Sequence, residues 1–335
     1  MSEQHLALYR KYRPQSFDDV VGQEQLVTLL SSAIKQNKIA HAYLFCGGRG
    51  TGKTTVARIF AKDIGCNPED IIEIDAASNR GIDEIRELRE AVRTAPFSSL
   101  YKVYIVDEAH MLTKEAANAL LKTLEEPPSH VIFILATTDP DKLPQTIVSR
   151  CQKVVFKSPD ITTLAKRLLH VVEKEGKKLS EGGAELIARH GKGSYRDALG
   201  TLEQILTTGA KIIKDEDVKA MLGTPDGELL LSLLEALCIK NGKQILELSE
   251  KLHANNSSAL RAYDELIELI RTGLLIRVGE NVSKTPELSR LATEYPHSIG
   301  SKLILELLEK RHLLEVSDAH SWIALEAVLL STIEN

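Results

Sequence analysis

The stretch AYLFCGGRGTGKT at residues 42–54 decides the fold class of this chain. Its first five residues are mostly apolar and aromatic, which is typical of a buried strand, and residues 47–54 fit the phosphate-loop pattern G-x-x-x-x-G-K-[ST]. The glycines let backbone N–H groups turn inward around a phosphate, and a helix beginning after the loop adds a favourable dipole. The pattern predicts a nucleotide site in which Lys53 bridges the β- and γ-phosphates and Thr54 holds Mg²⁺.

Short apolar runs recur along the first half of the chain, at residues 42–46, 71–74, 103–106, 131–135 and 154–156. Runs this short, with mostly β-branched or aromatic residues, are typical of central strands in a parallel sheet. Helical patterns lie between them, at residues 54–63, 82–94 and 114–125. This alternation of strands and helices predicts a three-layer α/β domain.

Two adjacent carboxylates, Asp107 and Glu108, directly follow the apolar run at residues 103–106. At the end of a strand, Asp107 can orient Mg²⁺ through its water ligands, and Glu108 can polarise the attacking water as a general base. An acidic turn after a core strand is the alternative interpretation, but the phosphate loop upstream favours the catalytic one. Two carboxylates rather than a lone Asp favour an ATPase that hydrolyses its nucleotide over a nucleotide kinase.

Three further positions are ambiguous when only the sequence pattern is considered. The segment ATTD at residues 136–139 follows a buried strand, and a polar side chain there could sense the γ-phosphate, although simple turn chemistry explains it equally well. Arg150 precedes the last apolar run of the domain, and Arg196 begins a helical pattern where it could reach the nucleotide or pair with an acidic neighbour. Taken alone, each arginine fits a surface charge better than a catalytic group.

The strand signal stops after residue 156, and the rest of the chain shows helical spacing. Three helical patterns, at residues 164–174, 183–190 and 195–207, predict a small helical domain. After a linker-like segment at 223–225, leucine-rich helical patterns follow at residues 229–237, 245–252, 259–276, 303–314 and 323–333. We therefore expect three domains, covering residues 1–158, 159–222 and 223–335.

Composition excludes several classes of protein for this 335-residue chain. Its net charge of −5 excludes a basic coat for nucleic acid, so any contact with nucleic acid must come from a local patch. The absence of a long apolar run and of an apolar leader predicts a cytoplasmic protein. The four cysteines are far apart in sequence and form no C-x-x-C pair, so neither a zinc site nor a disulfide framework is expected.

Several sequence runs resemble the clamp-loader AAA+ ATPases, and specifically the gamma/tau family of bacterial DNA polymerase III. They are YRKYRP at residues 9–14, IDAASN at 74–79, NALLKTLEEPP at 118–128, ATT at 136–138 and SRC at 149–151. The resemblance covers most of residues 6–199. It implies an α/β P-loop ATPase domain with a parallel sheet, a small helical lid domain, and an all-α collar that joins subunits in a ring.

The resemblance also implies a role for individual residues. Thr138 corresponds to the first sensor, Arg196 to the second sensor, and Arg150 to an arginine finger that acts on the ATP of the neighbouring subunit. The implied contacts with ATP are made by Val20, Val21, Gly47, Gly48, Arg49, Gly50, Thr51, Gly52, Lys53, Thr54 and Thr55.

The function implied is that of an ATP-driven motor subunit, which places the sliding clamp on primer–template DNA within the replisome of the bacterial nucleoid. The implied partners are the clamp, the other loader subunits and the DNA backbone, for which Arg80 and Lys114 are candidates, although solvated surface charge fits either residue equally well. A non-hydrolysing stator of the same ring and a branch-migration motor are the alternatives. The intact phosphate loop and Glu108 favour the motor over the stator, and residues 223–335 lack the strand signal of a winged-helix module.

The chain departs from the gamma/tau pattern in two places. At residues 61–70, where the family usually has a four-cysteine zinc module, this sequence has no inserted module. The segment contains one cysteine, Cys66. We therefore expect ATP and Mg²⁺ as cofactors but no zinc. The long tau tail has no counterpart after the presumed collar, so the polymerase and helicase contacts that need that tail are not carried over from the resemblance.

Overall fold

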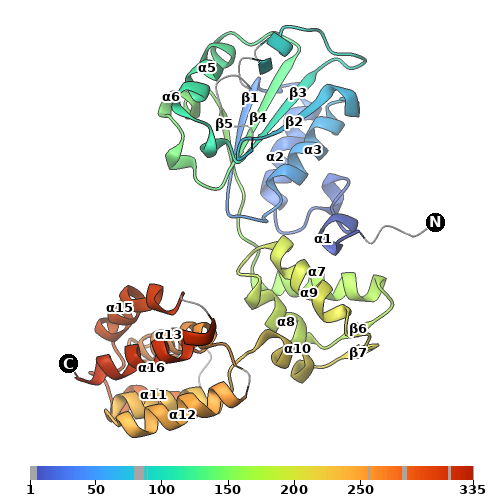
Figure 1. Ribbon diagram of the computed structural model, residues 1–335. Helices are drawn as coiled ribbons and strands as arrows, with labels where there is room; N and C mark the ends of the chain where they lie inside the picture. Colours follow the sequence, from blue (N-terminus) through green and yellow to red (C-terminus); the bar gives the residue numbers. More distant parts are fainter. Residues whose placement is uncertain are drawn as a thin grey trace. The chain divides into compact units, whose positions relative to one another are not determined.

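The computed structural model describes residues 6–78, 87–88, 90–255, 257–280, 285–315 and 318–334. The chain divides into two compact units, Met1–Lys214 and Asp215–Asn335, which are described separately below. The first unit contains the phosphate loop, and the described residues of the second form helices and connecting segments without a strand (Figure 1).

The first unit is built on a sheet of five parallel strands in the order β2-β3-β4-β1-β5. The strands are β1 (Ala42–Cys46), β2 (Ile71–Asp75), β3 (Lys102–Asp107), β4 (Val131–Thr137) and β5 (Gln152–Val155). Because the strands are parallel, their carboxyl ends meet at one edge of the sheet, which is where open α/β sheets bind ligands. The order places the end of β4 between the ends of β1 and β3.

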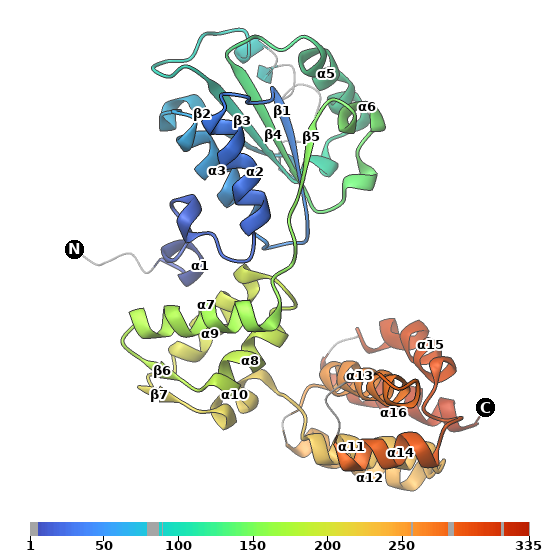
Figure 2. The same cartoon turned by 180° about the vertical axis from the view of Figure 1, so that it is seen from behind.

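Helices cover both faces of this sheet, as the three-layer prediction requires. Helices α2 (Glu24–Lys35) and α3 (Lys53–Asp63) lie on one face, and α5 (Lys114–Glu125) and α6 (Gln145–Val148) lie on the other (Figures 1 and 2). Side chains alternate along each strand, so Tyr43 and Phe45 of β1 join one core while Leu44 and Cys46 join the other. Burial on both faces explains why these strands appear in the sequence as continuous apolar runs.

Strand β1 has the predicted bounds, and the boundaries of the other four strands differ from the predicted ones by one or two residues. The last strand was predicted at residues 154–156, but β5 spans Gln152–Val155, because polar Gln152 and Lys153 pair with Tyr43 and Leu44 at the sheet edge. Strands β2, β3 and β4 likewise extend into polar residues that a search for apolar runs leaves out. The predicted helix at residues 82–94 lies only partly within the described residues, of which 87, 88, 90 and 91 are helical.

Besides the short helix α1 (Leu8–Lys11), three longer helices complete the first unit: α7 (Ile161–Lys174), α8 (Glu181–His190) and α9 (Tyr195–Leu206). Each of these three begins after a residue whose side-chain oxygen accepts a hydrogen bond from a backbone N–H of the first turn, namely Asp160, Ser180 and Ser194. The prediction that no strand follows residue 156 was wrong. Two parallel strands of two residues each, β6 (Lys178–Leu179) and β7 (Ile212–Ile213), are too short to show a period in the sequence.

The second unit packs its helices around one leucine- and isoleucine-rich core. Its elements are α10 (Asp215–Leu222), α11 (Gly227–Cys238), α12 (Gly242–Ala254), α13 (Ala259–Arg277), α14 (Pro286–Glu294), α15 (Ser301–Lys310), a 3₁₀ turn at Arg311–Leu314 and α16 (Asp318–Glu334). Helix α14 was not predicted, although its Thr285 cap and the proline at its first position are start signals. No helix within the described part of the chain is long and apolar enough to cross a membrane.

Candidate nucleotide-binding site

The phosphate loop connects β1 to α3 at the carboxyl edge of the sheet. Gly50 and Gly52 have φ values of 69° and 103°, a left-handed conformation that side-chain-bearing residues rarely adopt. The Lys53 ammonium is buried and donates to the carbonyl oxygens of Gly47 at 2.8 Å and Gly48 at 2.9 Å. Burial lowers the pKa of Lys53, and the nearby Glu108 and Asp107 carboxylates only partly oppose that shift.

Thr54 and Asp107 come together although they lie on different elements. The Thr54 hydroxyl, in the first turn of α3, donates to Asp107 Oδ2 at the end of β3 over 2.6 Å. A hydroxyl and a carboxylate supply the hard oxygen atoms that Mg²⁺ prefers, with phosphate and water oxygens as its other ligands. The described residues contain no cluster of three or more His, Cys, Asp or Glu that could hold a metal ion by itself. The pair therefore fits an ion that is bound together with a nucleotide.

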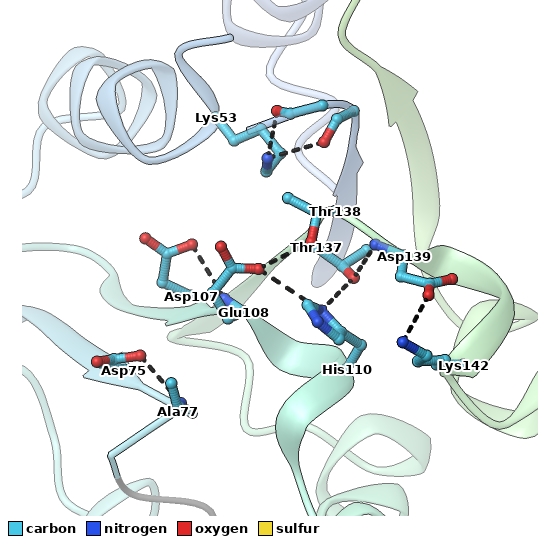
Figure 3. A network of polar contacts seen from close by, with 12 residues as sticks. Lys53, Asp75, Ala77, Asp107, Glu108, His110, Thr137, Thr138, Asp139 and Lys142 are labelled. Carbon is cyan, nitrogen blue, oxygen red and sulfur yellow. Dashed lines mark hydrogen bonds and ion pairs between the residues drawn. The ribbon is translucent and has the colours of Figure 1, made fainter. Parts of the chain in front are cut away.

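Glu108 belongs to a polar network at the ends of β3 and β4 (Figure 3). Thr138 Oγ1 donates to Glu108 Oε2 over 3.1 Å. His110 Nδ1 lies 3.5 Å from the same carboxylate oxygen and 3.0 Å from the hydroxyl of the fully buried Thr137. The backbone N–H of Asp139 also donates to that hydroxyl, over 3.0 Å. The network holds the carboxylate of Glu108 beside β4 and adds His110, which lies in a run that resembles the gamma/tau family but had no assigned role.

A pocket opens at this edge of the sheet, and we call it the P-loop pocket. The predicted residues that line it are Val20, Val21, Arg49, Gly50, Thr51, Gly52, Lys53, Thr54, Thr55, Asp107, Glu108 and Arg196. Three other predicted residues do not line the pocket but form hydrogen bonds with residues that do. The carbonyls of Gly47 and Gly48 accept hydrogen bonds from Lys53, and the hydroxyl of Thr138 donates one to Glu108. The structure thus brings together sequence segments from the N-terminal region, the loop, the Asp-Glu pair and helix α9.

Other residues that line the P-loop pocket were missed from the sequence: Tyr9, Tyr12, Arg13, Pro14, Asp19, Gln23, Val56, Arg167, Tyr195 and Leu199. Several lie in the YRKYRP run, which carried the family resemblance but had no assigned role. Several contacts tie the N-terminal segment to helices α7 and α9 and to the C-cap of α7, and two of them involve residues that line the P-loop pocket on both sides. Arg167 donates to the Tyr12 carbonyl over 2.7 Å, and the Arg196 guanidinium lies 5.9 Å from the Tyr9 ring centroid.

Positive charge gathers around the P-loop pocket, where Arg13, Arg49, Lys53, Arg167 and Arg196 all contribute to the lining. Burial, followed by repulsion from Arg58 and Arg196, lowers the pKa of Arg13. The cations outnumber the three carboxylates of the same lining, Asp19, Asp107 and Glu108, so an anionic ligand would relieve the remaining repulsion. The arrangement suits a polyanionic ligand such as a nucleoside triphosphate.

The remaining predicted residues lie elsewhere. Arg150 does not line the P-loop pocket of its own chain: it donates to Glu125 Oε1 over 2.6 Å and to the Thr146 carbonyl over 2.7 Å. Lys114 is exposed at the first position of α5. Arg80 lies outside the described residues.

Comparison with known proteins decides the family. The model of the "DNA polymerase III, delta subunit" family matches residues 22–81 and 69–160, and the model of "DNA polymerase III subunits gamma and tau domain III" matches residues 213–312. The chain is 38% identical over 285 residues to the DNA polymerase III subunit gamma of Buchnera aphidicola, covering 79% of this chain and 78% of that protein. The chain belongs to the gamma/tau family of DNA polymerase III subunits. The resemblance inferred from the sequence is thereby confirmed.

Longer members of the gamma/tau family are also similar to this chain. It is 40% identical over 327 residues to subunit tau of Bacillus subtilis, covering 90% of this chain and 58% of that protein. For subunit tau of Escherichia coli the identity is 41% over 301 residues, covering 83% of this chain and 46% of that protein. The chain therefore spans about half the length of these tau subunits.

Solved structures confirm the AAA+ fold class. The RuvB Holliday junction branch migration motor of Thermotoga maritima superposes with a TM-score of 0.54, at 20% identity, over 82% of this chain and 94% of that one. At this identity the likeness concerns the fold alone.

Proposed function

We propose that this chain is the ATP-driven motor subunit of a bacterial clamp loader, which uses ATP binding and hydrolysis to place a sliding clamp on primer–template DNA. The observation that carries the proposal is the direct hydrogen bond between Thr54 and Asp107, with Lys53 and Glu108 lining the same pocket. These four side chains supply a phosphate-binding cation, two metal-facing oxygens and a candidate base. Membership of the gamma/tau family supplies the clamp-loader context.

ATP binding in the P-loop pocket needs complementary groups at both ends of the nucleotide. At the phosphate end, the ammonium of Lys53 exchanges the carbonyls of Gly47 and Gly48 for phosphate oxygens. Thr54 and Asp107 would hold Mg²⁺, which neutralises phosphate charge when it is bound. At the other end, Val20 and Val21 with neighbouring tyrosines offer an apolar, aromatic surface for the base. Arg196, at the start of α9, faces the same pocket as a second sensor.

Hydrolysis requires a group that takes a proton from the attacking water, and Glu108 is the residue placed to do so. It lies directly after Asp107 and lines the P-loop pocket. The hydroxyl of Thr138 and the ring of His110 fix the orientation of its carboxylate. A contact from Thr138 to this base gives the first sensor a direct way to report on the γ-phosphate, because any movement of Thr138 moves its partner.

Arg150 acts in trans in this proposal. In its own chain the guanidinium bonds to Glu125 and the Thr146 carbonyl, away from the lining of the P-loop pocket. The side chain is about one-third exposed, with a relative exposure of 34%, so a neighbouring subunit can reach it. An arginine at the edge of one subunit can stabilise charge on a nucleotide held by the next.

The proposed partners are the sliding clamp, other subunits of the ring, including copies of this chain, and the DNA backbone, in the bacterial cytoplasm at the nucleoid. Exposed apolar side chains support protein contacts. Phe97 and Leu100 are 85% and 74% exposed on the loop before β3, and Leu305 is 66% exposed on α15. Residues 1–158, 159–222 and 223–335 serve in this proposal as the ATPase, lid and collar domains.

ATP and Mg²⁺ are the proposed cofactors, without zinc. Cys66, in the segment where the family usually has a zinc module, is buried and its thiol donates to the Tyr101 carbonyl over 3.3 Å. Burial raises the pKa of Cys66 to about 11. A zinc ligand must be a thiolate, so this environment opposes a metal at Cys66.

Steady-state ATP hydrolysis by the full chain, alone and with sliding clamp and primer–template DNA, tests the proposal. We expect Mg²⁺-dependent turnover that clamp and DNA increase, and loss of ATP binding and turnover in Lys53→Ala, with circular dichroism showing an intact fold. Lys62→Ala, which changes an exposed lysine of the same helix, is the control. Unchanged affinity and turnover in Lys53→Ala would refute the site, ATP binding without turnover would indicate a stator, and stimulation by branched DNA alone would indicate a branch-migration motor.

A further inference from the structure

Tyr195, the first residue of α9, contacts two separate segments that line the P-loop pocket. Its hydroxyl donates to the carbonyl oxygen of Val21 over 2.8 Å, across 174 positions of sequence. Its backbone N–H donates to the carbonyl oxygen of Gly50 over 3.0 Å. Val21 belongs to the end of the pocket proposed for the base, and Gly50 belongs to the phosphate loop. One residue therefore connects both ends of the pocket.

The two segments pack closely against the start of α9. A Cβ atom built on Gly22 would lie 3.0 Å from the Tyr195 hydroxyl, and one built on Gly50 would lie 2.0 Å from the Ser194 hydroxyl. Glycine at both positions lets the backbone approach the helix at these distances. The hydrogen bonds of Tyr195 are thus part of a fitted contact between backbone segments and helix α9.

The Tyr195 hydroxyl remains a proton donor throughout the neutral range. Burial is the main cause that raises the pKa of Tyr195 to about 12, and the Glu24 and Asp160 carboxylates add to it while Arg167 opposes it. Residues 20–22, which receive the bond, lie in neither a helix nor a strand. Their other hydrogen bonds are local: the Val20 N–H donates to the Phe17 carbonyl over 3.1 Å, and the Gly22 N–H donates to Glu24 Oε1 over 3.0 Å. Tyr195 therefore supplies a distant anchor. Of the three residues, Val21 is 40% exposed, so its own packing fixes it only weakly.

We infer that Tyr195 is a positioning residue that holds the base-binding segment in register with the phosphate loop before ATP arrives. The inference rests on the proposed function and deepens it by naming what prepares the base end of the pocket. A segment that is already ordered does not lose conformational freedom on binding, so this order should increase affinity for ATP. Removing the Tyr195 hydroxyl should weaken the binding only of ligands that have a base. The contact with the phosphate loop is made by the backbone N–H of Tyr195 to Gly50, so it remains when the side chain is changed.

The test is Tyr195→Phe in the full chain, which removes the hydroxyl and keeps the ring. We expect the dissociation constant for ATP·Mg²⁺ to rise by about 3- to 10-fold, the change that loss of one hydrogen bond produces. The dissociation constant for inorganic tripolyphosphate, which has neither base nor ribose, should change less than about twofold. KM for ATP should rise while kcat at saturation stays within about twofold, because the hydroxyl does not touch Glu108.

Tyr263→Phe is a matched control, because Tyr263 makes the same kind of bond, to the Leu307 carbonyl over 2.7 Å, within the second unit. It should leave both dissociation constants unchanged. Unchanged or tighter ATP binding in Tyr195→Phe would overturn the inference, and so would equal weakening of ATP and tripolyphosphate. Wild-type protein that fails to bind ATP would instead overturn the proposed function, and the inference with it.

Discussion

Glu108 adopts a left-handed backbone conformation with a φ of 49°, directly after the last residue of β3. Residues other than glycine rarely adopt this conformation, and it is concentrated at functional sites. Here the turn accompanies two side-chain contacts, one from Thr138 and one from His110 (Figure 3). Local backbone geometry and the neighbouring strand thus act together on the proposed base.

Arg150 gives the sharpest prediction at the level of single residues. An arginine finger contributes about 10³- to 10⁵-fold to the rate, whereas a surface ion pair contributes about 0–1 kcal/mol to stability and almost nothing to the rate. We expect Arg150→Ala to lower turnover by about that factor in the assembled ring. Mixing Arg150→Ala subunits with Lys53→Ala subunits should restore part of the rate, because an intact loop then meets an intact Arg150 across some interfaces.

Glu125→Gln is the control for this experiment, because it removes the ionic partner of Arg150 and keeps the arginine. If Arg150 acts in trans, Glu125→Gln should retain near-normal turnover. If Glu125→Gln lowered the rate of ATP hydrolysis as much as Arg150→Ala does, the ion pair between Glu125 and Arg150 within one chain would explain the loss, and a role of Arg150 on the neighbouring subunit would not be needed. Absence of rescue at every mixing ratio, with normal assembly, would also contradict the trans role.

Sequence patterns located Lys53, Thr54, Asp107 and Glu108, because each motif residue contributes its own chemistry at a fixed spacing. Those patterns assigned no role to His110 and Tyr195, because their contacts depend on which strand or helix lies beside them. The Tyr195 hydroxyl, for example, bonds to a carbonyl 174 positions away. A local pattern contains no information about such a partner.

At the scale of elements, a carboxylate fixes the exposed loop that precedes β3. Asp70 is buried and accepts hydrogen bonds from the backbone N–H groups of Phe97 at 2.6 Å, Ser98 at 3.0 Å and Ser99 at 2.9 Å. Burial alone would raise the pKa of Asp70, but these hydrogen bonds outweigh it and hold the pKa at about 2, below its ordinary value of 3.8. Because the folded pKa lies below the unfolded one, the ionised carboxylate stabilises the fold above about pH 4.

Asp70→Asn should therefore lower the free energy of unfolding by about 2 kcal/mol at pH 7. The stabilisation is lost as pH falls through the folded pKa, so the difference from wild type should shrink to about half by pH 3. Urea unfolding between pH 3 and 7 measures it. Asp63→Asn is the control: Asp63 is an exposed residue whose pKa is raised by partial desolvation, so this substitution should not lower the free energy of unfolding at pH 7. A deficit in Asp70→Asn that does not change with pH would contradict the assignment.

Long elements were easier to predict than short ones. Strand β1 and helix α5 have the predicted bounds, because buried strands and amphipathic helices repeat their pattern over several residues. Strands β6 and β7, with two residues each, contain no repeat. Helix α14 had start signals at Thr285 and Pro286, but its short apolar pattern was not recognised.

At the scale of the whole molecule, the domain boundaries were the least accessible feature. The sequence predicts a boundary at residues 222–223 because of a linker-like segment, and this bound stays a prediction. The chain forms two compact units that divide between Lys214 and Asp215, so α10 groups with the second unit. The grouping of a helix depends on tertiary packing, which glycine and proline positions do not report. Fold class and family, in contrast, rest on motifs spread over most of the chain, and both were predicted.

The chain has a net charge of −5, so contact with DNA must depend on local groups that meet phosphates. We expect DNA-stimulated ATP hydrolysis in the assembled loader to weaken steeply with salt and to ignore base sequence. A plot of the logarithm of the DNA-binding constant against the logarithm of salt concentration should have a slope that is smaller by about one in Lys114→Ala. Lys122→Ala, at an exposed position of the same helix, should leave that slope unchanged. Stimulation that is insensitive to salt, or that depends on sequence, would count against backbone contacts.

The central claim, that this chain hydrolyses ATP as a motor, is tested most directly by Glu108→Gln in this chain alone within the assembled complex. Glutamine keeps the shape of the side chain and can still accept from Thr138, but it cannot take a proton from water. We predict that ATP affinity stays within about twofold of wild type while ATP turnover falls by about 10²- to 10⁴-fold. Turnover at the wild-type rate, with ATP bound, would contradict the claim and leave the chain a stator.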